Sequence, residues 1–157
     1  MHRATILAGG NLGDVAARFK EAERLLAERG VAVVARSQNY SSRAWGFECE
    51  DCFTNSAWSV ATELEAEPLL DVLQEVEALL GRNREAEHRE KASKGARYCS
   101  RTLDLDIIFY DEEHISTERL KVPHPLIMER EFVITPVCEL LQCSREELAR
   151  RIERIYA

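Results

Sequence analysis

The chain has 157 residues, 45% of them hydrophobic, and a formal net charge of −7. This length predicts one domain over residues 1–157 with a substantial core, and it leaves too little chain for two domains. The acidic balance argues against a general nucleic-acid binder, because neutralising phosphates requires a basic surface. No apolar run is long enough for a signal-peptide core or a membrane span. We therefore expect a cytoplasmic protein without a membrane partner.

The first part of the chain predicts a strand, a helix and a second strand. Residues 3–8 form a short apolar run, and the turn over residues 9–14 is rich in residues that tolerate positive φ. Apolar residues then recur at helical spacing until Gly30, and a valine-rich strand follows over residues 31–35. The turn lacks the glycine patterns of nucleotide-binding loops, so we interpret it as structural. The predicted buried residues of the helix are Val15, Phe19, Ala22 and Leu26, with Asn11 or Asp14 as its cap.

Residues 38–52 are interpreted as a loop with aromatic side chains, among them Tyr40 and Trp45, which suggest a flat ligand. The loop also holds Cys49 and Cys52 in a C-x-x-C arrangement. The chain has no second pair of this spacing, as a zinc site would need, so we interpret them as ordinary thiols. An odd total of five cysteines without a secretory context also favours free thiols over a disulfide framework.

Residues 53–64 alternate as a strand, with Phe53, Asn55 and Ala57 on one face. An aromatic ring beside an amide would suit a heterocycle, the ring for stacking and the amide for paired hydrogen bonds. The alternative is a packed strand whose asparagine is satisfied within the protein. The opposite face is predicted to carry Trp58, Val60, Thr62 and Leu64.

The second helix is predicted to begin near Pro68 and to end at Gly81. Gln74 and Glu77 lie off its apolar stripe, where they are either solvated or line a site beside the next segment. The predicted stripe consists of Leu69, Leu73, Val76 and Leu80.

Residues 82–101 concentrate positive charge, with seven Lys and Arg residues against three Glu residues. One interpretation is a solvated linker, because the segment lacks apolar periodicity. The segment runs directly into two aspartates, however, so guanidinium groups and carboxylates converge as polyphosphate chemistry requires. The basic residues are Arg82, Arg84, Arg89, Lys91, Lys94, Arg97 and Arg101.

Residues 101–110 alternate as a strand that carries Asp104 and Asp106 on one face. Carboxylates roughly 7 Å apart on an otherwise apolar strand repel each other. Mg²⁺ prefers oxygen ligands, and two ions could share this pair. Two solvated acids on an exposed face are the alternative. The predicted faces are Thr102, Asp104, Asp106 and Ile108 on one side and Leu103, Leu105, Ile107 and Phe109 on the other.

A predicted turn over residues 111–114 is followed by residues 115–122, which lead to the sequence Pro123-His124-Pro125. The two prolines stiffen the backbone at His124, which would suit a fixed phosphate contact. An irregular or helical piece with Arg130 and Phe132 follows.

The end of the chain predicts a structural helix, because Ser144 and Glu147 match a capping box. Its apolar side would carry Leu148, Ile152 and Ile155. The element order predicts an α+β fold: a ferredoxin-like βαββαβ core with a mainly antiparallel sheet, flanking helices and a C-terminal extension.

Five motifs follow one another along the chain: Gly9-Gly10-Asn11-Leu12-Gly13-Asp14, Phe53-Thr54-Asn55, Gly81-Arg82-x-Arg84, Arg101-Thr102-Leu103-Asp104-Leu105-Asp106-Ile107 and Val122-Pro123-His124-Pro125. In this order they resemble the 6-hydroxymethyl-7,8-dihydropterin pyrophosphokinase family of folate biosynthesis. The resemblance covers nearly the whole chain, and its most specific part is R-T-x-D-x-D-I followed by V-P-H. It implies transfer of pyrophosphate from ATP to the hydroxymethyl group of the pterin, with release of AMP and with two Mg²⁺ ions.

The resemblance also implies roles for individual residues. Asp104 and Asp106 would hold the metal ions, and they would be catalytic together with Arg82 and Arg101. The implied ATP-binding residues are Gln74, Glu77, Arg82, Arg84, Arg101, Ile107, Arg119, Lys121, His124 and Arg130. The implied pterin-binding residues are Ser42, Arg43, Trp45, Phe53, Asn55, Tyr98 and Phe132.

Two alternatives to this function remain. A two-metal nucleotidyltransferase also pairs a glycine turn with D-x-D on a strand, but it releases pyrophosphate instead of AMP. A non-catalytic module that binds a pterin or nucleotide and controls a partner is the second. In each case we expect small-molecule ligands, no nucleic acid, and a monomer or weak homodimer.

Overall fold

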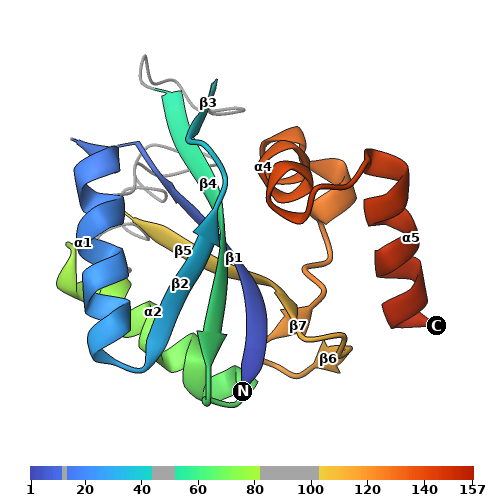
Figure 1. Ribbon diagram of the computed structural model, residues 1–157, viewed down its shortest axis with the longest axis horizontal. Helices are drawn as coiled ribbons and strands as arrows, with labels where there is room; N and C mark the ends of the chain where they lie inside the picture. Colours follow the sequence, from blue (N-terminus) through green and yellow to red (C-terminus); the bar gives the residue numbers. More distant parts are fainter. Residues whose placement is uncertain (12–13, 44–51, 82–102) are drawn as a thin grey trace, which may run out of the picture.

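The computed structural model describes residues 1–11, 14–43, 52–81 and 103–157, with the backbone alone at residues 42, 43 and 52. Within these residues the centre of the fold is a five-stranded sheet of order β2-β4-β1-β5, in which β3 pairs with β4 (Figure 1). Every pairing in this sheet is antiparallel. The strands are β1 (His2–Gly10), β2 (Val31–Arg36), β3 (Tyr40–Arg43), β4 (Cys52–Thr62) and β5 (Asp104–Tyr110).

One face of the sheet is covered by α1 (Val15–Glu28) and α2 (Ala66–Leu79) (Figure 1). The Phe19 ring of α1 meets Trp58 of β4 edge-on, with 5.5 Å between the ring centroids. With β3 set aside, the strand and helix order is the split βαβ plan, so the predicted α+β fold is confirmed. The predicted core residues Val15, Phe19, Ala22, Leu26, Leu69, Leu73 and Val76 are all buried.

Both ends of α1 lie where the sequence predicts them. Asp14 is the N-cap, and its side chain accepts a hydrogen bond from the Ala17 N–H at 3.0 Å. Gly30 turns the chain into β2 with a φ of 80°, a conformation in which a side chain would be strained.

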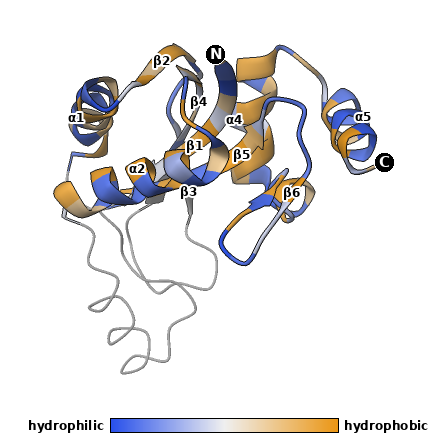
Figure 2. Ribbon diagram, turned by 90° about the horizontal axis from the view of Figure 1, so that it is seen from below, coloured by the Kyte–Doolittle hydropathy of each residue, from blue (hydrophilic) through white to orange (hydrophobic). Residues whose placement is uncertain are grey.

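The other face of the sheet is covered by α4 (Glu131–Leu141), where the sequence left an irregular or helical piece open. Val133, Ile134 and the internal Pro136 disfavour a helix by propensity. All three side chains are buried, and α4 is apolar over most of its length in Figure 2. Burial against β1 and β4 therefore overrides the local preference.

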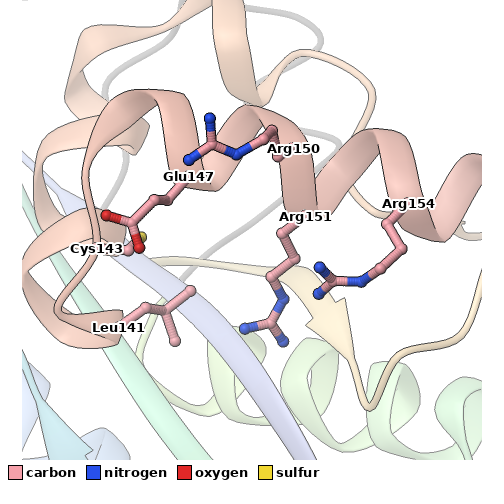
Figure 3. Close-up of a pocket in the computed structure, with 6 residues that line it drawn as sticks. All are labelled: Leu141, Cys143, Glu147, Arg150, Arg151 and Arg154. Carbon is pink, nitrogen blue, oxygen red and sulfur yellow. The ribbon is translucent and has the colours of Figure 1, made fainter.

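The last helix, α5 (Arg145–Tyr156), begins with the predicted capping box, in which Ser144 accepts from the Glu147 N–H at 3.1 Å. Leu148 is buried, and Ile152 and Ile155 pack against the same core as α4. Several arginines project from α5 beside the end of α4 (Figure 3). No helix in the described part of the chain is long and apolar enough to cross a membrane.

The connection between β5 and α4 covers residues 111–130. It contains the hairpin of β6 (Ile115–Ser116) and β7 (Lys121–Val122), followed by a 3-10 turn, η1 (Ile127–Glu129). Residues 115–122, for which the sequence predicted no particular structure, therefore form a two-stranded hairpin.

Strand β3 corrects the prediction of a loop over residues 38–52. Tyr40 pairs with Asn55, and Arg43 pairs with Cys52. The residues of β3 do not alternate between apolar and polar, and β3 pairs only with the first part of β4. Its sequence therefore carries little strand signal.

A β-bulge in β5 changes which side chains reach which helical layer. Ile107 and Phe109 pair with consecutive residues of β1, so Ile108 is the extra residue. As a result Phe109 packs with Ile108 in the α4 core, and Tyr110 packs in the α1–α2 core. The prediction that Phe109 shares a face with Ile107 is therefore wrong, while the predicted faces of residues 103–107 are confirmed. Thr102 lies outside the described residues.

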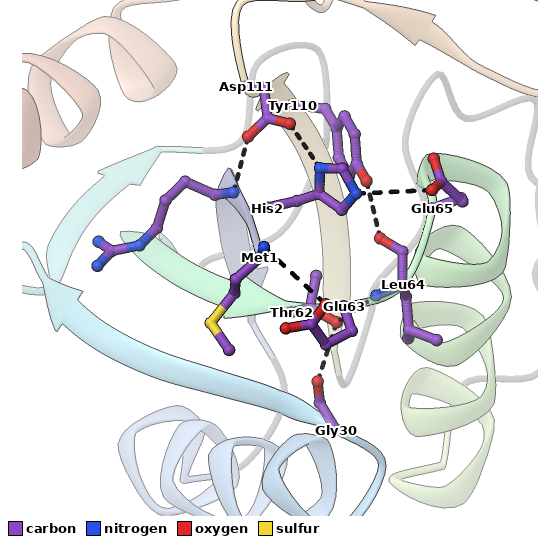
Figure 4. Close-up of polar contacts among 10 residues, drawn as sticks. Met1, His2, Gly30, Thr62, Glu63, Leu64, Glu65, Tyr110 and Asp111 are labelled. Carbon is purple, nitrogen blue, oxygen red and sulfur yellow. Dashed lines mark hydrogen bonds and ion pairs between the residues drawn. The ribbon is translucent and has the colours of Figure 1, made fainter.

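A polar network ties the start of β1 to the end of β5 (Figure 4). The His2 ring nitrogen Nδ1 lies 2.7 Å from Asp111 Oδ2, and the Arg3 N–H donates to Asp111 Oδ1 at 2.8 Å. The hydrogen bond to Asp111 raises the pKa of His2 above its ordinary value of 6.5. Burial opposes ionisation of Asp111, but the Arg3 N–H and His2 outweigh it and lower its pKa from 3.8.

These shifts predict a pH-dependent stability. A raised histidine pKa stabilises the fold fully below the unfolded value of about 6.5, and the stabilisation is lost as pH rises through the folded value. His2→Gln should therefore lower the melting temperature more at about pH 5.5 than at about pH 9. In the Asp111→Asn background the same substitution should show little pH dependence. A difference that grows with pH would contradict this account.

Candidate functional site

The sheet register aligns Asn55 and Asp104, the two strongest candidates from the sequence, in one row of paired residues across the strands. Such a row is called a rung below. Gly9 of β1 pairs with Asn55 of β4 on one side and with Asp104 of β5 on the other. Two strand spacings, about 10 Å, therefore separate the Cα atoms of Asn55 and Asp104. On the next rung but one, Leu7 lies between Ala57 and Asp106.

The same register shows which face the site occupies. Residues paired directly across a ladder, and residues two apart along a strand, present side chains to the same face. Leu7 and Ala57 pack in the α4 core. Asn55, Asp104 and Asp106 therefore point to the face that α4 partly covers, away from α1 and α2.

Gly9 allows the backbone of β1 to approach the Asn55 amide closely. A Cβ at this position would lie 2.6 Å from Asn55 Oδ1, which is closer than any ordinary contact. Asn55 is buried, with 5% of its surface exposed. The glycine thus keeps the amide in place and leaves the middle of the rung without a side chain.

Asp104 and Asp106 are both half-buried on β5. Among the residues described, no cluster of three or more His, Cys, Asp and Glu side chains could hold a metal on its own. A pair of carboxylates still fits Mg²⁺, which commonly binds one or two protein carboxylates and completes its shell with water and substrate phosphates.

Glu77 of α2 supports the strand between these aspartates. Its Oε2 accepts a hydrogen bond from the Leu105 N–H at 2.7 Å, on the edge of β5 that faces away from β1. Glu77 is 2% exposed. Glu77 therefore does not lie off the buried side of its helix, and the solvated alternative is wrong, because the carboxylate is buried beside β5.

Glu77→Ala should lower the free energy of unfolding by about 1–3 kcal/mol, since it leaves the Leu105 N–H without its acceptor. It should also slow turnover about tenfold or more, because small displacements of catalytic groups are costly. Glu77→Gln keeps an acceptor oxygen and should recover most of both losses. Denaturant unfolding and the rate of the pyrophosphate transfer expected from the resemblance measure the two effects, and unchanged values in Glu77→Ala would refute the supporting role.

His124 is held in one orientation beside β5. Its backbone N–H donates to Ile108 O at 3.1 Å, and its Nδ1 accepts from the Leu126 N–H at 3.2 Å. Nε2 therefore carries the ring proton and is the donor. Burial lowers the pKa of His124, and the charge of Arg130 lowers it further, while Asp104 opposes the shift. Because both charges act on His124, Asp104 and Arg130 both lie near its ring.

Arg130 and Phe132 stand at the start of α4, on the face of the sheet that carries Asn55. The Arg130 guanidinium lies 5.7 Å from the centroid of the half-buried Phe132 ring. Phe53, two residues before Asn55 on β4, is also half-buried. The structure thus brings Asn55, Phe132, His124, Arg130 and the two aspartates to one side of the sheet.

Three other predicted ATP-binding residues lie on α2 or in the connection between β5 and α4. Arg119 forms ion pairs with Asp71 and Glu67, with its NH1 nitrogen 3.7 Å from Glu67 Oε1. Gln74 is exposed one helical turn beyond Asp71, so Arg119 lies along the same face as Gln74. Lys121 is exposed, and its Nζ donates to Ser116 Oγ at 3.1 Å.

A comparison with protein-family models supplies the deciding observation. Residues 5–142 match the model described as 7,8-dihydro-6-hydroxymethylpterin-pyrophosphokinase (HPPK). The chain belongs to the HPPK family. Members of this family are ATP-dependent diphosphotransferases that act on hydroxymethyldihydropterin in folate synthesis, and the resemblance identified from the motifs is confirmed.

Similar HPPK proteins occur in bacteria and plants. The chain is 40% identical over 141 residues to the 2-amino-4-hydroxy-6-hydroxymethyldihydropteridine pyrophosphokinase of Methylorubrum extorquens, covering 89% of this chain and 83% of that protein. It is 36% identical over 145 residues to the enzyme of the same name from Bacillus subtilis, covering 92% and 81%. A folate synthesis bifunctional protein of Arabidopsis thaliana is 36% identical, and the match spans 26% of its length.

Solved structures with the same fold include HPPK-DHPS of Plasmodium falciparum. One of them has a TM-score of 0.64 at 13% identity, over 99% of this chain and 47% of that chain. Another has a TM-score of 0.61, also at 13% identity. The chain spans less than half the length of these proteins, and at this identity the likeness concerns the fold.

Some of the predicted site residues lie outside the described residues, and one is buried in the core. The Ile107 side chain is 3% exposed and packs in the α1–α2 core. Its predicted contact with ATP could therefore involve only the backbone, and it stays a prediction. Ser42 and Arg43 belong to β3, but their side chains are not described. The candidates outside the described residues are Trp45, Arg82, Arg84, Tyr98 and Arg101.

Proposed function

We propose that this HPPK chain transfers pyrophosphate from ATP to the hydroxymethyl group of 6-hydroxymethyl-7,8-dihydropterin across the rung formed by Asn55, Gly9 and Asp104. The observation that carries the proposal is that an amide and two carboxylates lie on one face of the sheet, with Gly9, which has no side chain, between Asn55 and Asp104. The pterin would lie toward Asn55, and the triphosphate would lie toward β5.

On the pterin side, the buried Asn55 amide would donate to and accept from the edge of the heterocycle. The rings of Phe53 and Phe132, both half-buried near this rung, would stack on its faces. Fixing the ring in this way orients the hydroxymethyl oxygen for in-line attack on the β-phosphorus of ATP. Ser42, Arg43, Trp45 and Tyr98 remain predicted contacts on this side.

On the nucleotide side, Asp104 and Asp106 would hold two Mg²⁺ ions. Bound there, the ions would neutralise charge on the phosphate oxygens during transfer. The Nε2–H of His124 and the Arg130 guanidinium would donate to phosphate oxygens, and Glu77 would hold β5 in position. Gln74, Arg119 and Lys121 would contact the rest of the nucleotide, with Arg82, Arg84 and Arg101 as predicted phosphate ligands.

We also infer the setting in which the protein works. The net charge of −7 supports a protein with small-molecule substrates and no nucleic-acid partner. We propose a cytoplasmic monomer or weak homodimer, folded as one domain over residues 1–157 and without a membrane partner.

The nucleotide product tests this function directly. With ATP, Mg²⁺ and the hydroxymethyl pterin, phosphorus NMR and chromatography should show one AMP for each pterin diphosphate formed. Release of inorganic pyrophosphate without AMP would instead identify a nucleotidyltransferase. Binding of both substrates with no turnover would identify a non-catalytic module, and either result would reject the proposal.

A further inference from the structure

The C-terminal end of α4 brings two cysteines together. Gln142 adopts the left-handed conformation with a φ of 53°. The Cys143 N–H donates to Cys138 O at 3.1 Å, and the Gln142 N–H donates to Glu139 O at 3.2 Å. This pair of bonds defines a Schellman motif, in which the side chains at the positions of Cys138 and Cys143 pack against each other.

The two thiols are free, half-buried and in hydrogen-bonding contact. Burial, together with the neighbouring Cys143, raises the pKa of Cys138 to about 11. Cys138 is therefore protonated at neutral pH and is a poor first nucleophile, because the thiolate is the reactive form. Its sulfur nevertheless lies where it can react with a modified Cys143.

Cys143 also lies in the wall of an open cavity of about 330 Å³ (Figure 3). Arg150, Arg151 and Arg154 of α5 line this cavity, together with Leu141 and Glu147. The three guanidinium groups make the wall predominantly positive, which favours an anionic molecule beside the thiol.

Two carboxylates, Glu147 and Glu112, offset part of this positive charge, and both have partners within the protein. Glu147 accepts from the Ser144 N–H in the capping box, at 3.4 Å. Glu112 is shared by Arg151 and Arg154 at 3.5 and 3.8 Å. Arg151 is further fixed over the Phe109 ring, 4.5 Å from its centroid.

We propose that Cys138 and Cys143 are a redox modification site, which a small acidic disulfide such as glutathione disulfide oxidises to an intramolecular disulfide through the arginine-lined cavity. This site is separate from the pyrophosphokinase activity. Acidic groups of the oxidant would pair with the α5 arginines and bring its disulfide bond to Cys143.

The chemistry takes two exchange steps. The Cys143 thiolate attacks one sulfur of the small disulfide, forms a mixed disulfide with it and releases one thiolate, which takes up a proton. Cys138 then loses its proton to solvent and attacks the Cys143 sulfur, which releases the second small thiol. Two protein thiols are thereby oxidised, and one small disulfide is reduced to two thiols.

The test treats the full-length reduced protein with glutathione disulfide at neutral pH and follows it by peptide mass spectrometry. The expected product is a Cys138–Cys143 disulfide, with the loss of two hydrogen atoms, preceded by a transient glutathione adduct on Cys143. Cys138→Ser should accumulate that adduct, because no second thiol resolves it. Cys143→Ser should leave Cys138 unmodified over the same time.

A charge variant tests the cavity. Arg150→Gln should slow the reaction with glutathione disulfide about threefold at low ionic strength and leave the reaction with the cationic disulfide cystamine no slower. Lys20→Gln on the exposed surface of α1, on the far side of the sheet from α5, should change neither rate. A lasting adduct on Cys143 in the unsubstituted protein, rapid modification of Cys138 in Cys143→Ser, or equal slowing by the two charge variants would overturn the proposal.

Discussion

Asp104→Asn is expected to lower the rate of AMP formation about a thousandfold, and Asp106→Asn should have a similar effect. Each substitution replaces a charged oxygen donor on β5 with a neutral amide, and metal-assisted charge stabilisation contributes several kcal/mol to such reactions. The loss should be accompanied by a higher Mg²⁺ concentration for half-maximal turnover. Steady-state kinetics over a Mg²⁺ series measure both quantities.

The matched control is Glu113→Gln, in the exposed turn after the same strand. It makes the same change from carboxylate to amide and should leave both quantities unchanged. If Asp104→Asn also left turnover and Mg²⁺-dependent nucleotide binding unchanged, the metal role of β5 would be wrong.

The second large effect is expected at the pterin side of the rung. Asn55→Ala should raise the KM for the pterin about a hundredfold, because a site built around an amide then loses its paired hydrogen bonds. Gly9→Ala should raise it about tenfold, since the new methyl group would lie 2.6 Å from Asn55 Oδ1 and push the amide aside.

A double-mutant cycle makes this prediction specific. In the Asn55→Ala background, Gly9→Ala should add less than about a twofold change, because the group it displaces is already absent. The KM for ATP should move little in any of the three variants. Additive effects on the pterin KM would show that Gly9 acts independently of Asn55.

Much of the fold could be predicted because local patterns and tertiary packing agree. The helical spacing of Val15, Phe19, Ala22 and Leu26 corresponds to one buried face of α1. The capping box at Ser144 likewise marks the start of α5. In these segments burial, capping and periodicity all favour the same structure.

The wrong or undecided predictions occur where long-range contacts decide the structure. The β-branched residues and Pro136 of α4 disfavour a helix, and only the apolar face of the sheet stabilises one there. Alternation in β5 cannot reveal the bulge at Ile108, because the bulge depends on pairing with β1. Glu77 was ambiguous for the same reason, since its acceptor role exists only once α2 packs beside Leu105.

Individual residues of the candidate site could be predicted from the sequence, but their positions relative to one another could not. Asn55, Asp104 and Asp106 could be singled out as side chains, but their common rung depends on strand register. Gly9 was interpreted as part of a structural turn. Its closeness to the Asn55 amide appears only when β1 and β4 are paired.

The fixed ring of His124 has a consequence for how the enzyme responds to acidity. Because Nδ1 is occupied as an acceptor and the pKa is lowered, the ring donates from Nε2 as a neutral imidazole throughout the neutral range. A contact that depends on an imidazolium weakens whenever the surroundings become alkaline, but this one has no charge to lose. The proposed hydrogen bond from His124 to phosphate should therefore keep its strength when the pH rises above neutrality.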